Sequence, residues 1–409
     1  MRPPFRAIPV LDRRRRRASW CLRQRDPSSP ACTMSAVVDV KRKESVWDMH
    51  HVDVKGIEAV GRRVLRALIL GSSNGFFRPG YVQAIADHPA FSETVNISLG
   101  ASPAIMAPYR MKGVDLSSFD YLFVETLIND AASISNGTYW REALADVLGW
   151  IVHEATCANA IPVGLLLPGD FAHQSMEEVA EIHKSAFGGR VLDMLPILRR
   201  VAQPIGPLMH DASHVHPKFS YLATKLFLDH LTACKSPLVQ QRSAARYLYI
   251  LASGARRVDI STSVVSDVAY RYDGGQSFTI PVPSGRSVVA LVFNQSNTRT
   301  VLKISGANTV LKDIRFDVDA PGGAKLIVSA MQPVIAGEQG VNFELTSLTG
   351  VERSYFVKPD RIEISGVIVR EGEPLSAIGE RSPTADIWRP TDSQIDHIRF
   401  EFNQSIQPV

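Results

Sequence analysis

The chain has 409 residues, of which 45% are hydrophobic and 21% are charged, as in ordinary soluble globular proteins. This length allows two domains, and four cysteines do not suggest a disulfide framework. The net charge is +4, but residues 1–45 contain twelve Lys and Arg residues and four acidic residues. The positive charge therefore lies in this segment, and the rest of the chain is mildly acidic. No stretch approaches the roughly 18 to 20 apolar residues of a membrane-spanning helix. We therefore expect no membrane span and no nucleic-acid partner.

Residues 1–45 are rich in Arg, Pro and Ser and hold few large apolar residues, so we expect a disordered basic tail there. Met34 is an alternative start of the chain, which would make residues 1–33 an over-extended reading of the gene. The five-arginine run is not followed by an apolar segment, so it does not read as an export signal. This absence favours a cytoplasmic location, although a glycan substrate would favour the cell envelope.

Residues 46–238 alternate between apolar runs and helical patterns, which predicts an α/β domain. Buried strands are expected at residues 66–70, 94–99, 121–124, 161–167 and 190–195. Apolar residues at 144, 147, 148, 151 and 155 fall on one face of a helix, and further helices are expected at 176–186 and 218–231. We expect a parallel sheet with helices on both faces, whose strands all end at the edge where ligands usually bind.

Residues 239–409 lack helical periodicity and read as an all-β, sandwich-like accessory domain. The strand-like runs there are 258–265, 277–282, 287–293, 300–304, 314–318, 324–330, 341–345, 361–369 and 397–402. Most of them are bounded by Gly, Pro, Asn or Asp. Nothing in this half of the sequence names a ligand, and the oligomeric state stays open.

The segment Gly71-Ser72-Ser73-Asn74-Gly75 directly follows the first predicted strand. A serine presented at a strand end acts as a nucleophile when a base lies nearby. Small polar residues also simply form strand-to-helix turns, so the segment alone does not decide between these interpretations. It matches neither of the glycine-rich patterns that bind phosphate groups in dinucleotide-binding and P-loop proteins.

Two further positions follow the second and third predicted strands. Asn129 comes after the strand at 121–124, where a side-chain amide can donate to a developing oxyanion. The alternative is an Asx turn or a helix N-cap, both common for Asn-Asp pairs. Gly100 ends the second predicted strand and places a backbone N–H toward the same edge, although glycine there is usually only a turn.

Asp211 stands three residues before His214, close enough for both side chains to meet on one turn. The carboxylate would then fix the imidazole tautomer, and the imidazole would take a proton from serine. A metal site made of His210, Asp211, His214 and His216 is one competing interpretation. The other is a polar loop before a helix that begins near Pro217.

The order of these motifs resembles that of the SGNH hydrolases, also called the GDS-type lipase/esterase family, over about residues 62–232. The matching residues are Ser73, Gly100, Asn129 and His214, with Asp211 completing a triad. The resemblance implies a flavodoxin-like three-layer α/β/α fold and an acyl-enzyme formed on Ser73. It also implies an oxyanion hole made by the Ser73 and Gly100 N–H groups and the Asn129 amide, with no metal and no organic cofactor.

The sequence departs from the family pattern in its first and third blocks. Ser72 stands where the family has Asp, and Leu127 stands where it has Gly. These departures keep Ser72 as an alternative nucleophile and His216 as an alternative base. Asn74 and Arg78 lie near the motif and are weak candidates for substrate binding.

The leading interpretation is a serine esterase or deacylase that acts on an acylated carbohydrate or another ester through an acyl-enzyme. One alternative is a polysaccharide O-acyltransferase on the same scaffold, which the sequence does not separate from a hydrolase. The other is a catalytically silent glycan-binding or assembly protein, which the Ser72 and Leu127 departures motivate.

Overall fold

The computed structural model describes residues 64–169, 174–233, 245–254, 256–262, 265–314, 325–346, 360–372 and 387–406. Contacts divide the chain between Glu44 and Ser45, and all the described residues belong to the second unit. The tail expected at residues 1–45 lies outside the described residues, as does the boundary expected at 238/239. In the part of the chain that the structure describes, no helix has the length and apolar character needed to cross a membrane.

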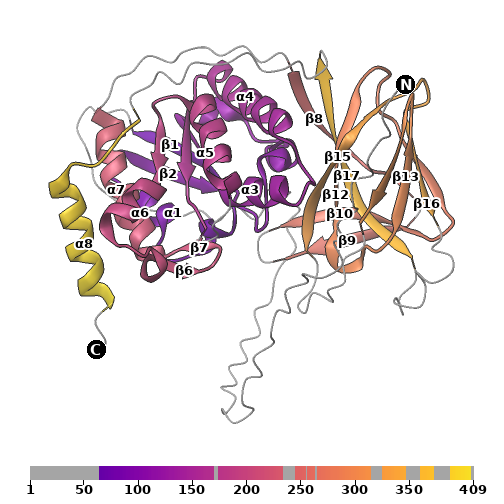
Figure 1. The fold of residues 1–409 in the computed structure, drawn as a ribbon. Helices are drawn as coiled ribbons and strands as arrows, with labels where there is room; N and C mark the ends of the chain where they lie inside the picture. Colours follow the sequence, from indigo (N-terminus) through magenta and orange to yellow (C-terminus); the bar gives the residue numbers. More distant parts are fainter. Residues whose placement is uncertain are drawn as a thin grey trace, which may run out of the picture. The chain divides into compact units, whose positions relative to one another are not determined.

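The first half of the described chain forms the predicted parallel sheet (Figure 1). Its strands are β1 (Leu65–Leu70), β2 (Phe91–Asn96), β3 (Tyr121–Val124), β4 (Ile161–Leu166) and β5 (Val191–Asp193). They lie in the order β2-β1-β3-β4-β5, which is the flavodoxin-like order. The order reverses between β1 and β3, and ligands bind at such a switch point, outside the carboxyl ends of the strands. This confirms the predicted fold class.

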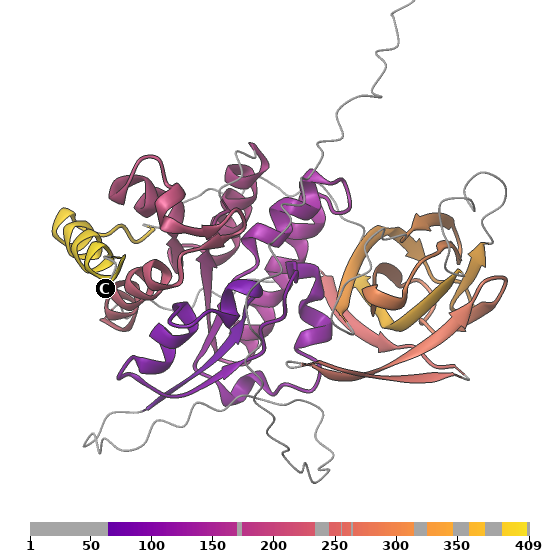
Figure 2. The ribbon, with the colours of Figure 1, turned by 90° about the horizontal axis from the view of Figure 1, so that it is seen from below.

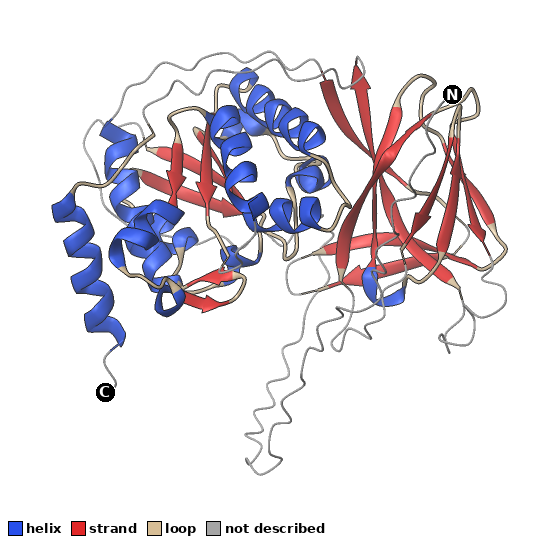
Figure 3. Ribbon diagram, viewed as in Figure 1, coloured by secondary structure: helices blue, strands red, loops and turns tan. Residues whose placement is uncertain are grey.

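Helices cover both faces of this sheet (Figure 3). They are α1 (Tyr81–Asp87), α2 (Ala107–Arg110), α3 (Leu127–Ser135), α4 (Arg141–Cys157), α5 (Gln174–Phe187), α6 (Met194–Val201) and α7 (Pro217–Ala233). Alternate residues of a strand point to opposite faces, so Leu68 and Leu70 share a core with α3, α4 and α5. Ala67 and Ile69 instead pack with α1, α6 and α7. The result is a three-layer α/β/α arrangement.

The described residues from 245 to 372 form antiparallel sheets that enclose a separate core (Figure 2). One sheet has the order β15-β12-β17-β10-β9, with β8 also pairing with β17, and the other has the order β11-β16-β13-β14. The strands are β8 (Ala245–Leu251), β9 (Arg257–Ser261), β10 (Ser266–Asp273), β11 (Ser277–Ile280), β12 (Ser287–Asn294), β13 (Val301–Ser305), β14 (Thr309–Asp313), β15 (Leu326–Ile335), β16 (Val341–Thr346) and β17 (Arg361–Gly372). The β-rich second part is therefore confirmed. Most of the strand expected at 314–318 lies outside the described residues, and the described strand that precedes it is Thr309–Asp313.

The strand predicted at residues 397–402 is wrong, because this segment belongs to helix α8 (Asp392–Ile406). Ile395, Ile398 and Phe402 are buried and lie three and four residues apart, so they form one helical face. This face packs on α6 and α7, where the Phe402 ring lies 6.0 Å from that of Phe219. The chain thus returns to the α/β part after the last strand that the structure describes.

Candidate active site

The nucleophile segment forms a tight turn at the carboxyl end of β1. Ser73 begins a short 3-10 helix (Ser73–Phe76), and the Gly75 N–H donates to the Ser72 carbonyl at 3.1 Å. A Cβ atom on Gly71 would lie 2.0 Å from the Tyr81 hydroxyl, and one on Gly75 would lie 2.3 Å from Ser98 Oγ. Both positions therefore require glycine, which explains the Gly-x-x-x-Gly spacing of the segment.

Ser73, His214 and Asp211 converge into one chain of hydrogen-bonding groups. Ser73 Oγ lies 2.7 Å from His214 Nε2, although 141 residues separate the two in sequence. His214 Nδ1 lies 2.8 Å from each carboxylate oxygen of Asp211. This is the geometry in which a carboxylate orients an imidazole and the imidazole takes the serine proton.

A small hairpin presents the histidine. Strands β6 (Met209–Asp211) and β7 (His214–Val215) pair with each other, and the Ser213 N–H donates to Asp211 Oδ1 at 2.7 Å. Pro217 then opens α7, a position that suits its fixed φ and its missing N–H. The Phe77 ring meets His214 edge-on, with centroids 5.0 Å apart, and this contact limits the rotation of the imidazole.

The electrostatics of Asp211 favour its role as an orienting carboxylate. Burial alone would raise the pKa of Asp211, but hydrogen bonds from the His214 side chain and the Ser213 N–H outweigh it and lower this pKa. The carboxylate therefore stays ionised at neutral pH. It is the charge needed beside an imidazole that becomes a cation during proton transfer.

The amide of Asn129 is available as a donor. Asn129 lies in the first turn of α3, and its Nδ2 is buried with no acceptor in the described part of the chain. A buried unpaired donor costs free energy, and such groups are common where a ligand supplies the missing partner. The loop before Gly100 runs beside the nucleophile turn, because the Leu99 N–H donates to the Gly71 carbonyl at 3.2 Å.

The structure separates the two alternates from the centre. Ser72 is fully buried, and its Oγ lies 2.8 and 3.0 Å from the carboxylate oxygens of Glu125. His216 packs edge-on against Phe402 at 5.0 Å, and its buried Nδ1 has no partner among the described residues. Burial, and to a smaller extent His210, lowers the pKa of His216. Neither side chain takes part in the Ser73–His214 contact.

The two weak substrate-binding candidates have different environments. Asn74 is only 3% exposed, and its Nδ2 donates to Glu125 Oε1 at 3.4 Å. This amide therefore supports the turn, and substrate binding by Asn74 stays a prediction. Arg78 is exposed, and its guanidinium donates to the Phe77 carbonyl at 3.4 Å. Substrate binding by Arg78 stays a prediction.

Three buried titratable residues beside the site, Glu125, Asp130 and His183, belong to none of the sequence motifs of the candidate triad. Glu125 directly follows β3 and receives hydrogen bonds from the nucleophile turn. Asp130, next to Asn129, accepts from the Ala104 N–H at 2.8 Å and lies 3.0 Å from His183 Nε2, in a pair with no exposed surface. An acidic residue after an apolar strand was the only sequence signal for Glu125, since its partners are distant in the chain.

No group of three or more His, Cys, Asp or Glu side chains is placed to hold a metal ion in the part of the chain described.

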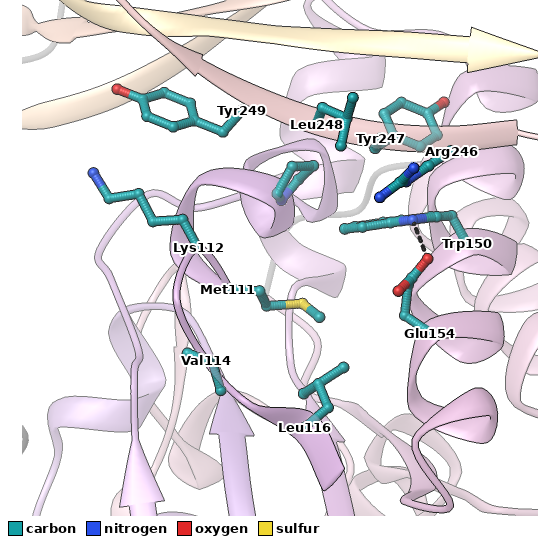
Figure 4. A pocket seen from close by; sticks show the side chains of 11 residues that line it. Met111, Lys112, Val114, Leu116, Trp150, Glu154, Arg246, Tyr247, Leu248 and Tyr249 are labelled. Atoms are coloured by element: carbon teal, nitrogen blue, oxygen red, sulfur yellow. Dashed lines mark hydrogen bonds between the residues drawn. The ribbon is translucent and has the colours of Figure 1, made fainter.

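A pocket of about 290 Å³ is lined by residues of α2, the loop before β3, the late part of α4, and β8 (Figure 4). Trp150 and Glu154, joined by a 3.0 Å hydrogen bond, form one wall, and Tyr249 and Lys112 form another. Val114 and Leu116 in its lining precede β3, whereas Ser73 follows the parallel strand β1. The pocket therefore belongs to the opposite edge of the sheet from the triad.

Comparisons with known proteins show the fold. No family model matches the sequence, and no curated protein matches it. The crystal structure of a two-domain esterase (CEX) active on acetylated mannans matches with a TM-score of 0.53 at 14% identity, over 76% of this chain and 92% of that chain. A structure of such an esterase co-crystallized with mannopentaose matches with a TM-score of 0.52 at 15% identity, with the same coverage. This protein therefore shares its two-part fold, an α/β domain joined to a β-rich domain, with the two-domain esterase.

Proposed function

We propose that this protein is a serine ester hydrolase of the SGNH type that acts on an acylated carbohydrate through an acyl-enzyme. The observation that carries the proposal is the continuous chain from Ser73 Oγ through His214 to Asp211. An ordinary polar loop would not be expected to align a serine, a histidine and an aspartate in this way, with the serine and the histidine 141 residues apart in sequence. The unpaired Asn129 amide and the shared fold with an esterase are independent support.

The geometry suits acyl transfer in two steps. Ser73 Oγ attacks the ester carbonyl while its proton passes to His214 Nε2, and Asp211 stabilises the resulting imidazolium. The carbonyl oxygen becomes an oxyanion that accepts hydrogen bonds from Asn129 Nδ2 and the Gly100 N–H. The tetrahedral intermediate collapses, and the alcohol leaves with the proton from His214. A water molecule then loses a proton to His214 and attacks the acyl-enzyme, which releases the acid and restores the Ser73 hydroxyl.

Two observations favour a saccharide as the alcohol part of the ester. The matching two-domain esterase is active on acetylated mannans, and its fold covers both parts of this chain. Phe76, in the turn that begins with Ser73, is 40% exposed, and a Cβ on Gly100 would lie 3.8 Å from its ring. An exposed aromatic ring beside the oxyanion donor can stack on the apolar face of a sugar.

Labelling with a fluorophosphonate probe, together with acetate release from acetylated mannan and xylan oligosaccharides, tests the proposal. The wild type is expected to label and to release acetate, and Ser73→Ala is expected to lose both. Ser72→Ala is the comparison for the alternative nucleophile: its hydroxyl faces Glu125, so labelling should slow but persist. A folded wild-type protein that neither labels nor hydrolyses any ester refutes the proposal. Labelling that persists in Ser73→Ala shows that the nucleophile is wrong.

A further inference from the structure

Glu125 lies directly beneath the nucleophile turn, with no surface exposed to solvent. It follows the last residue of β3, and its own N–H donates to the Leu70 carbonyl at the end of β1. The side chain thus reaches from one strand end to the turn after the neighbouring strand. A buried carboxylate is costly unless it is fully hydrogen-bonded, so its partners show what it is for.

Every hydrogen-bonding group around this carboxylate can act as a donor toward it. The Ser72 N–H donates to Oε2 at 2.8 Å, and Ser72 Oγ donates to the carboxylate at 2.8 and 3.0 Å. The Asn74 amide and the Tyr81 hydroxyl each donate at 3.4 Å. Only the ionised form accepts all these bonds, since a protonated carboxyl uses one oxygen as a donor.

The partners are also the residues on either side of the nucleophile. Ser72 and Asn74 flank Ser73, so the carboxylate holds the backbone before Ser73 and the side chain after it. On the far side, Arg110 of α2 is buried and donates to the Ile97 carbonyl and to Ser102 Oγ, in the loop that carries Gly100. The facing titratable groups are therefore Tyr81 from α1 and Arg110 from α2.

We propose that Glu125 is a positioning residue for the reaction proposed above, and that its ionised carboxylate fixes the 72–74 turn so that Ser73 Oγ stays aimed at His214. Protonation of Glu125 removes an acceptor for the hydrogen bonds from Ser72 and Asn74, and the 72–74 turn is then held less firmly. The inference rests on the proposed hydrolase function, because it describes a state of that same nucleophile.

Burial sets the pH range over which Glu125 changes its charge. Desolvation raises the pKa of Glu125 to about 7, and hydrogen bonds from Ser72 and Asn74 offset part of that effect. Arg110 offsets a further part, and its own pKa is lowered by burial to about 9. Glu125 therefore changes its charge near neutral pH, so the protonated and ionised states are both accessible to experiment.

The test compares Glu125→Gln with the wild type from pH 5.5 to 8.5, using hydrolysis of p-nitrophenyl acetate. Glutamine is isosteric and neutral, so it imitates the protonated state at every pH. At pH 8 we expect kcat to fall by ~10- to 100-fold with KM little changed, as for a small misplacement of the nucleophile. At pH 5.5 the ratio of wild-type to variant kcat should approach one. Glu154→Gln, a part-buried carboxylate in the pocket at the opposite sheet edge, is the control and should show wild-type rates.

A merely structural role would give a ratio that does not change with pH, and this result overturns the proposal while leaving the hydrolase function intact. A wild type that neither hydrolyses nor labels overturns the function itself, and the inference falls with it. If Glu125→Gln does not fold, the wild-type profile alone decides. Because protonated Glu125 still supports a reaction slower by ~10- to 100-fold, the acid limb of wild-type log kcat/KM should be steeper than one just below neutral pH, and a limb whose slope nowhere exceeds one refutes the role of Glu125.

Discussion

Replacement of Asn129 by alanine should lower the catalytic rate without lowering the stability of the fold. The Asn129 Nδ2 group is buried and makes no hydrogen bond within the described chain, so the substitution removes no contact from the resting protein. It also removes an unsatisfied donor and places a better helix former in the first turn of α3. We therefore expect the free energy of unfolding to stay within about 1 kcal/mol of the wild-type value or to rise.

The effect on the reaction should be much larger. Loss of one oxyanion donor typically costs about 2.7–4 kcal/mol of transition-state stabilisation, a fall of ~10²- to 10³-fold in kcat. The assay is kcat for p-nitrophenyl acetate, together with denaturant unfolding of the same samples. Asn136→Ala, at the exposed carboxyl end of the same helix, is the matched control and should keep wild-type rates.

Two results would refute this reasoning. A kcat within about threefold of wild type would show that the amide does not face the oxyanion. A loss of more than about 2 kcal/mol of stability would show that Nδ2 holds a bond in the resting protein after all.

Three further predictions follow from contacts around the site. Asp211→Asn should lower kcat by ~10²- to 10⁴-fold with little change in folding, measured by steady-state kinetics, because an amide no longer stabilises the imidazolium. Gly71→Ala should destabilise the protein by about 1–3 kcal/mol in urea unfolding, since its Cβ would meet the Tyr81 hydroxyl, whereas Gly149→Ala in α4, with open space at its Cβ, should stabilise it by about 0.5–1 kcal/mol. Burial raises the pKa of Glu125 in the folded state from 4.5 to about 7, so the folded protein holds the Glu125 proton more tightly than the unfolded chain does. The resulting contribution to the free energy of unfolding is complete below pH 4.5 and is lost as the pH rises to 7. From pH 4.5 to 8, wild-type unfolding free energy should therefore fall by about 3 kcal/mol relative to Glu125→Gln, and parallel pH curves would contradict this.

The parallel sheet was predictable because its strands are short apolar runs bounded by turn residues. The strand at 121–124 has the predicted bounds, and the others shift by a few residues. The run at 190–195 ends early, because Asp193 caps α6 through a hydrogen bond to the Leu195 N–H. Helix α8 was missed because residues 397–402 alternate apolar and polar over a short window, which hides a helical face that includes Ile395.

The candidate site was predictable where its geometry is local. Asp211 and His214 lie three residues apart, and their spacing alone suggested the contact that the structure shows. The resemblance to the family motif indicated Ser73 rather than Ser72, but the physical reason, the contact of Ser72 with Glu125, is visible only in the structure. Glu125 acts on Ser72 across 53 residues and two strands, so its part in the site needed the three-dimensional arrangement.

The return of the chain to α6 and α7 through α8 has a consequence for biosynthesis. The ring of His216, two residues after the proposed base, rests on Phe402, and the Arg399 guanidinium donates to the carbonyls of Arg200 and Val201. During translation the α/β part emerges from the ribosome first, yet α8 follows only after all the described β strands have been made. The segment that carries the histidine thus gains its last support late, and a nascent chain without α8 leaves the apolar faces of α6 and α7 uncovered.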